Sequence, residues 1–212
     1  MIGRKVQRAA LLEGAIECIQ EKGYTRTTVR DIVAAAGSHL PSINYYFGSK
    51  DALMDEALVE SARRWLVLLT GVAAEKSSRD PWEWLRAVGA ELLRASDENR
   101  PLLVAFLEAR AQAERSEDLR RRLAKEIEDY RVALIRLAEP LLPPETVADR
   151  SVPEGFASLL LALADGLMTM RLLDPERSPS WEDVLRAAQL TATAPARRAG
   201  RTRPRASRQS QG

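Results

Sequence analysis

The chain has little of the chemistry on which most enzymes and metal proteins depend. Its 212 residues include one cysteine, Cys18, and one histidine, His39, so no intrachain disulfide and no Cys/His ligand pair can form. The sequence also lacks a glycine-rich phosphate loop, a histidine-based triad and a cluster of metal ligands. We therefore expect no catalytic residues, no metal, no cofactor and no enzymatic activity. Cys18 is expected to be a small core residue, with a redox sensor as the lesser alternative.

Aromatic residues are scarce, at 5% of the chain, and runs of β-branched residues are short. Alanine, leucine, arginine and glutamate dominate, and these residues favour helices. The length allows one large or two small domains. The predicted fold class is all-α.

Long hydrophobic runs are also rare. Residues 1–10 have no apolar core long enough for a signal peptide, so cytoplasm is the expected compartment. The longest apolar run, residues 155–173, is interrupted by Asp165 and lacks interfacial aromatics. No membrane is expected, and a helix buried at an interface explains the run better.

The net charge of +2 is unevenly distributed along the chain. Residues 1–50 carry a net +3, residues 51–193 a net −7, and residues 194–212 six arginines with no acid. Basic ends on an acidic body suit a protein that approaches a polyanion from one end, although solvated surface charge is the simpler alternative.

Residues 27–50 predict two short helices joined by a tight turn. Thr28 can cap the first helix, and Asp31, three residues later, can bond back to the Thr28 amide. Gly37 suits the left-handed turn that ends this helix, and Ser38 offers a hydroxyl to cap the next. Pro41 is tolerated in a first turn. The pattern is typical of a helix-turn-helix.

The second of these helices, about residues 40–47, has only two clear inward candidates, Ile43 and Phe47. Ser42, Asn44 and Tyr45 carry polar groups that suit phosphates and base edges. The composition is therefore that of a recognition helix.

These residues carry a resemblance to a known family. Thr27-Thr28, Ala36-Gly37 and the run from Tyr45 through Leu53 follow a first helix that ends in Lys22-Gly23-Tyr24. Together they resemble the DNA-binding end of tetracycline-repressor-type (TetR family) transcriptional regulators, over about residues 5–55 without a gap. Ser38 and His39 depart from the usual apolar residue and Ser after the turn glycine, and Asn44 replaces the commonest Tyr.

The resemblance implies a division of labour in the DNA-facing segment. Thr28, Tyr45, Tyr46 and Lys50 match family positions that touch the phosphate backbone. The others are expected to face base edges or lie beside them: His39, Leu40, Pro41, Ser42 and Asn44.

Helical periodicity continues through the rest of the chain. The first helix, about 4–22, is expected to pack through Val6, Ala9, Leu12, Ile16 and Ile19, with phosphate contact or solvation as alternatives for Arg4, Lys5 and Arg8. Six further helices are expected at about 49–76, 82–95, 100–114, 116–139, 154–172 and 181–190, with a loop over 140–153. The predicted domains are a DNA-binding head at 1–48, a ligand-binding and dimerisation body at 49–193, and a basic disordered tail at 194–212.

The helix around Leu163 is apolar on nearly every side and must be covered. In the family the last two helices pair with a second subunit, so this helix is the candidate for a homodimer interface. The alternative is the core helix of a monomer.

The family also implies a small-molecule effector bound within the body. Trp65, Phe106 and Met168 can line an apolar cavity, although ordinary core packing is the alternative for each. Arg110 shares a stripe with Phe106, and its partner is expected to be Glu108, Asp165 or an anionic ligand, with an internal or snorkelling salt bridge favoured.

The sequence thus predicts a homodimeric regulator that binds a double-stranded DNA operator, with a repressor released by a small molecule favoured. Two alternatives stay open at this point. One is a helical ligand-binding or enzymatic protein that only echoes the head motif, and the other is a DNA-binding regulator without a ligand.

Overall fold

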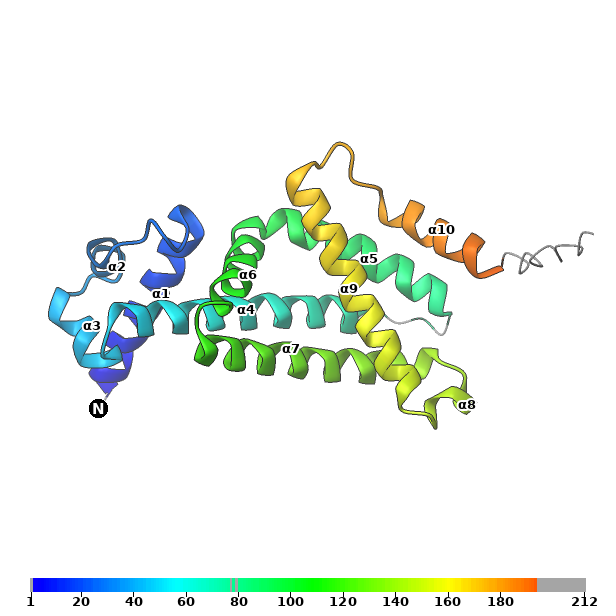
Figure 1. The fold of residues 1–212 in the computed structure, drawn as a ribbon, viewed down its shortest axis with the longest axis horizontal. Helices are drawn as coiled ribbons and strands as arrows, with labels where there is room; N and C mark the ends of the chain where they lie inside the picture. Colours follow the sequence, from blue (N-terminus) through cyan, green and yellow to red (C-terminus); the bar gives the residue numbers. More distant parts are fainter. Residues whose placement is uncertain (1, 77, 79, 194–212) are drawn as a thin grey trace, which may run out of the picture.

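The computed structural model describes residues 2–76, 78 and 80–193, and every regular element in these ranges is a helix (Figure 1). The head contains α1 (Ile2–Lys22), α2 (Val29–Ala35) and α3 (Leu40–Phe47). The body contains α4 (Lys50–Glu75), α5 (Pro81–Glu98), α6 (Arg100–Ala113), α7 (Glu117–Ala138), η1 (Glu139–Leu141), α8 (Pro144–Val147), α9 (Ser151–Leu173) and α10 (Trp181–Thr193). The predicted all-α fold is confirmed, and the predicted tail at 194–212 lies outside the described residues.

The long helix α4 joins the two parts. At its start it packs against α1 and α3, and further along it contacts α5, α6 and α7, with α7 running beside it (Figure 1). The buried residues follow it from head to body in one continuous cluster that includes Ile32, Ile43, Leu58 and Trp65. A movement of α4 therefore changes packing in both parts at once.

The packing face of α1 differs from the prediction. Val6 is 61% exposed, whereas Leu11, which was not expected inside, is completely buried. The cause is Gly14, because a Cβ there would lie 3.0 Å from backbone atoms of α2. The absence of a side chain lets α2 approach on that side, so the buried stripe includes Leu11 and Cys18 beside the expected Ile16 and Ile19. Cys18 is buried, as expected of a core residue.

The predicted loop over 140–153 is wrong in part. Most of it is occupied by a 3-10 turn (Glu139–Leu141), the short helix α8 (Pro144–Val147) and the start of α9, which begins at Ser151 rather than 154. Prolines near the first turn of a helix cost nothing, since the N–H that they lack has no intrahelical partner there. The prolines therefore correctly predicted the end of α7, but they do not exclude a helix that begins at Pro144.

Helix α9 is the one described helix whose length and composition would allow it to cross a membrane. It packs against α7 and α5, yet only 22% of its most apolar window is buried. Helix α10 packs on α5, where the indole Nε1 of Trp181 donates to the backbone oxygen of Leu85 at 2.7 Å. One side of α9 is thus left uncovered by the described residues.

Candidate nucleic-acid interface and ligand cavity

The start of α2 is fixed by a reciprocal cap. The Thr28 hydroxyl oxygen accepts from the Asp31 amide at 3.2 Å, and the Thr28 amide donates to Asp31 Oδ2 at 2.9 Å. The other carboxylate oxygen of Asp31 receives Lys22 Nζ at 2.6 Å, which ties α2 to the end of α1. The bonds from Lys22 and Thr28 hold the pKa of Asp31 well below its usual range. The predicted capping box is confirmed.

The turn between α2 and α3 closes as a Schellman motif around Gly37, whose φ is 55°. The Ser38 amide donates to the Val33 oxygen at 2.9 Å, and the Gly37 amide to the Ala34 oxygen at 3.3 Å. The prediction that Ser38 caps α3 is wrong, because His39 holds the N-cap position without a side-chain bond. The Ser38 hydroxyl is buried and has no partner among the described residues. Ser38 closes the turn through its amide and lies one position before the N-cap, so its side chain does not cap the next helix.

The residues expected to face DNA lie mostly on the outer side of α3. Leu40 is 51% exposed and Tyr45 62% exposed, and Pro41 and Asn44 are exposed as well. Ile43 points inward and is buried, as predicted. Among the remaining expected residues, Thr28 and His39 are exposed, and Ser42, Tyr46 and Lys50 are half-buried. The outer side of α3 thus presents one hydroxyl and one amide beside apolar groups.

Cations from α1 lie against the aromatic end of α3. The guanidinium of Arg4 lies 5.0 Å from the centre of the Tyr45 ring, and that ring packs edge-on against Tyr46 with centroids 4.8 Å apart. Arg8 lies 4.6 Å from the Phe47 ring and pairs with Glu56 at 2.6 Å. Glu56 therefore balances the charge of Arg8, whereas Arg4, beside an exposed tyrosine, forms no ion pair with any described residue.

An open hollow of about 410 Å³ lies between α2, α3 and the start of α4, with Leu40, Pro41, Asn44 and Lys50 on its wall. Lys50 forms no ion pair with any described residue, nor does Arg30, an exposed residue in the first turn of α2 that the sequence analysis missed. Such cations suit phosphate groups at the rim of a groove. The sequence pattern does not mark Arg30 as a DNA-binding residue, because arginines are common on the exposed faces of helices.

The four residues predicted to line a ligand cavity come together in the body. Trp65 of α4, Phe106 and Arg110 of α6, and Met168 of α9 border one small cavity of about 20 Å³. Tyr130 of α7 completes its wall, so four helices contribute. The binding of a molecule in this cavity stays a prediction.

Arg110 has Asp165 as its ion-pair partner in that cavity wall. Its guanidinium also lies 5.3 Å from the centre of the Phe106 ring. Glu108, the other partner considered, faces the head instead, where its Oε2 accepts from the Tyr24 amide at 2.9 Å. Helix α6 thus carries a cavity residue and a residue that holds the head only two positions apart.

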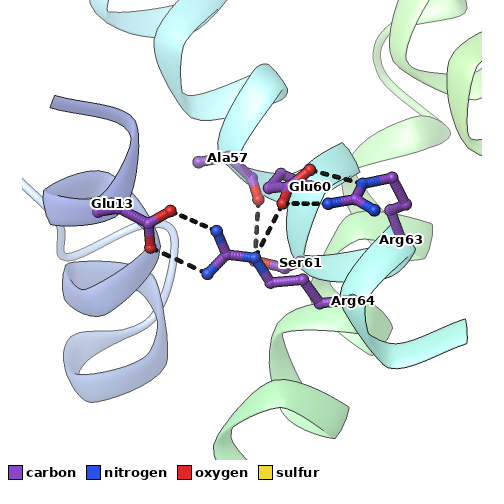
Figure 2. A network of polar contacts seen from close by, with 6 residues as sticks. All are labelled: Glu13, Ala57, Glu60, Ser61, Arg63 and Arg64. Carbon is purple, nitrogen blue, oxygen red and sulfur yellow. Dashed lines mark hydrogen bonds and ion pairs between the residues drawn. The ribbon is translucent and has the colours of Figure 1, made fainter. Parts of the chain in front are cut away.

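A second connection between head and body runs through α4. Figure 2 shows Arg64 between Glu13 of α1 and Glu60 of its own helix, with N···O distances of 2.9 Å to each. Arg63 pairs with the same Glu60 at 2.7 Å. These charges balance, and the bond from Arg63 holds the pKa of Glu60 low. Arg64 precedes the cavity residue Trp65, so one turn of α4 contacts both the first helix and the cavity.

A short capped helix, a glycine turn and a second helix with an exposed polar and aromatic side define a helix-turn-helix DNA-binding protein. Residues 11–57 match the family described as bacterial regulatory proteins of the tetR family. Residues 81–198, more than half of the chain, match the C-terminal region of BetI-type transcriptional repressors. The chain belongs to the TetR family and is a transcription regulator of the BetI type.

Relatives and solved structures agree with this assignment. The HTH-type transcriptional regulator BetI of Rhizobium meliloti (strain 1021) is 31% identical over 164 residues, which cover 76% of each chain. BetI of Agrobacterium fabrum is 30% identical over 165 residues, which cover 76% of this chain and 75% of that protein. A TetR transcription regulator from Haloarcula marismortui shares the fold, with a TM-score of 0.63 and 24% identity over 86% of this chain and 94% of that one.

Proposed function

We propose that the protein is a homodimeric, cytoplasmic repressor that binds a double-stranded DNA operator through α2 and α3 and leaves it when a small molecule enters the body cavity. The observation that carries DNA binding is the outer side of α3, where Asn44 and Tyr45 are exposed between Thr28 and Lys50. The repressor role is supported by the match of residues 81–198 to BetI-type transcriptional repressors.

Two copies are favoured by the uncovered side of α9. Its exposed residues recur every three or four positions, which places them on one face of the helix. Apart from Ser151, Val152 and Ser158, they are Gly155, Leu159, Ala162, Gly166, Met170 and Leu173. Leu173 is 80% exposed and Leu159 62% exposed, and a Cβ at Gly166 would meet nothing within 4 Å. Small residues between large apolar ones let a second helix approach closely, and a two-fold axis pairs the same patch on both copies.

Leu163, on which the expected interface was centred, is half-buried and packs on the core of its own chain. The proposed dimer surface therefore centres on Leu159 and Ala162, on the exposed side of the helix next to Leu163. A monomer that leaves this stripe in water would carry an apolar patch of the kind that marks association sites.

Release from DNA is supported by the two connections between cavity and head. Trp65 and Arg110 line the cavity, and their near neighbours Arg64 and Glu108 bond to Glu13 and to the Tyr24 amide of the head. A ligand that shifts α4 or α6 would shift the positions from which each head is held. In a dimer, that shift alters the spacing of two heads that must match one operator.

Two substitutions on the DNA-facing surface test the DNA assignment. Lys50→Ala removes a phosphate contact, so it should weaken binding to all duplexes alike and reduce the salt slope by about one ion. Asn44→Ala removes an amide that can pair with adenine at two points, so it should cost about 1–3 kcal/mol and relax the preference at one base pair. Binding-site selection and salt titrations measure both effects.

Binding that is independent of salt would contradict the DNA assignment in favour of the helical ligand-binding or enzymatic alternative. An unchanged selected operator with Asn44→Ala would contradict only the base-reading role of Asn44. Val67→Ala, on the exposed side of α4, is the matched control, because Val67 is 58% exposed and lies in the body. The regulator without a ligand is tested by the release of DNA across a panel of small molecules.

A further inference from the structure

Trp65 is a fully buried residue with an unused hydrogen-bond donor. It is 0% exposed, and its indole Nε1 has no partner among the described residues. Trp181 shows the usual arrangement, with its Nε1 bound to the Leu85 oxygen at 2.7 Å. A buried N–H without a partner destabilises a fold unless some other group accepts its hydrogen. Because Trp65 lines the cavity, a molecule in the cavity can supply that acceptor.

The ionic groups of the cavity wall already satisfy each other. Arg110 pairs with Asp165, and Arg110 also lies over the Phe106 ring. The rest of the lining is apolar apart from the tyrosine hydroxyl of Tyr130. A charged ligand would have to open the ion pair and leave one of its members unpaired in a partly buried site. An uncharged ligand leaves the pair intact.

The cavity is one of two neighbouring voids that share part of their wall. Each void measures about 20 Å³, which is room for roughly one water molecule. Tyr130 and Ala164 line both voids, and Trp181 lines only the second. Tyr130 also borders an outer groove of about 440 Å³ between α4 and α7, beside Gly71. Its hydroxyl bonds to no described residue, so no hydrogen bond holds the ring in place.

We infer that the two voids form one effector site for an uncharged, largely apolar molecule that carries a hydrogen-bond acceptor for Trp65 Nε1. The inference follows from the unpartnered indole N–H, the paired charges of the cavity wall and the residues that both voids share. To admit the molecule, Tyr130 swings toward the outer groove. The inference rests on the proposed function in taking this cavity as the effector site. It names the chemical class of the effector and one donor that recognises it.

Four probes of nearly equal shape and equal non-hydrogen atom count separate the possibilities: acetophenone, its hydrocarbon analogue α-methylstyrene, the anion benzoate and the cation benzamidinium. Binding is measured on the full chain without DNA, through the indole N–H resonances of ¹⁵N-labelled protein. Acetophenone should move the Trp65 resonance downfield and leave in place that of Trp82, an exposed tryptophan that lines neither void. It should also bind roughly three- to tenfold more tightly than α-methylstyrene, the gain expected of one net hydrogen bond.

Trp65→Phe keeps an aromatic ring and removes the donor, so it should abolish the preference for acetophenone over α-methylstyrene. A Trp65 resonance that acetophenone does not move, or equal affinities for ketone and hydrocarbon, would overturn the acceptor role. Tighter binding of benzoate or benzamidinium would overturn the uncharged class. The spectra and affinities of the wild-type protein test the proposal by themselves, so the test does not depend on whether the variant folds.

Tyr130→Ala removes the partition and should speed the association of acetophenone several-fold, and an unchanged rate would exclude Tyr130 as the gate. None of these measurements contains DNA. Their failure therefore leaves the DNA-binding proposal intact, and a failure of operator binding leaves the site assignment intact.

Discussion

Replacing Gly23 with alanine should loosen the head from the body. Gly23 ends α1 with a φ of 83°, a conformation that costs glycine nothing and an L-residue about 1–2 kcal/mol. A Cβ at this position would lie 2.9 Å from Oε1 of Glu108, closer than such atoms approach in proteins. The carboxylate must therefore move away from Gly23.

The cost of that movement follows from what the carboxylate holds. Oε2 of Glu108 accepts from the Tyr24 amide at 2.9 Å in a partly buried site. A bond to a charged acceptor contributes about 1.5–3 kcal/mol. Together with the backbone strain, Gly23→Ala should lower the free energy of unfolding by about 2.5–5 kcal/mol, with the amide of Tyr24 exchanging its hydrogen much faster.

Urea unfolding at a fixed protein concentration measures the loss, and hydrogen exchange reports on the Tyr24 amide directly. Glu108→Ala alone removes the bond without the strain, so in its background Gly23→Ala should cost only the strain of about 1–2 kcal/mol. Glu108→Gln is the matched control, because an amide oxygen can still accept. If the losses from Gly23→Ala and Glu108→Ala add to within about 0.5 kcal/mol, the two residues do not meet as described.

Three further predictions concern the stripe, the cavity and the cap. Leu159→Arg should convert the dimer to a monomer in light scattering, whereas Val67→Arg, a change at a similarly exposed position outside the stripe, should leave it dimeric; a dimeric Leu159→Arg protein would move the interface elsewhere. Arg110→Ala leaves Asp165 without its ion-pair partner, so probe preference should shift from acetophenone toward benzamidinium while DNA binding without effector stays nearly unchanged; equal loss of both functions would mark Arg110 as purely structural. Because the pKa of Asp31 is lowered in the folded chain, its stabilising contribution is present above the unfolded pKa of about 4 and is lost as pH falls below that value; Asp31→Asn should flatten this acid loss, and a parallel decline in both proteins would contradict it.

The local features of the head were determined by the sequence alone. The Thr28–Asp31 cap, the left-handed Gly37 and the inward Ile43 depend on residue type and spacing over a few positions, and all three are present in the structure. The cap of α4 is of the same local kind, since the Ser49 hydroxyl accepts from the Ala52 amide at 3.0 Å. Interactions between residues a few positions apart depend only on the local sequence, so they can be predicted without the rest of the fold.

Only the tertiary structure decided which residues far apart in sequence would meet. Periodicity shows that a helix has an apolar face, but the neighbour that covers it sets the rotation of that face, as the approach of α2 at Gly14 shows for α1. Likewise the sequence allowed Glu108, Asp165 or an anionic ligand as the partner of Arg110, and the folded chain brings Asp165 of α9 to it. The orphan indole of Trp65 and the uncovered stripe of α9 are properties of packed helices, because burial and the absence of a partner depend on every element around a side chain.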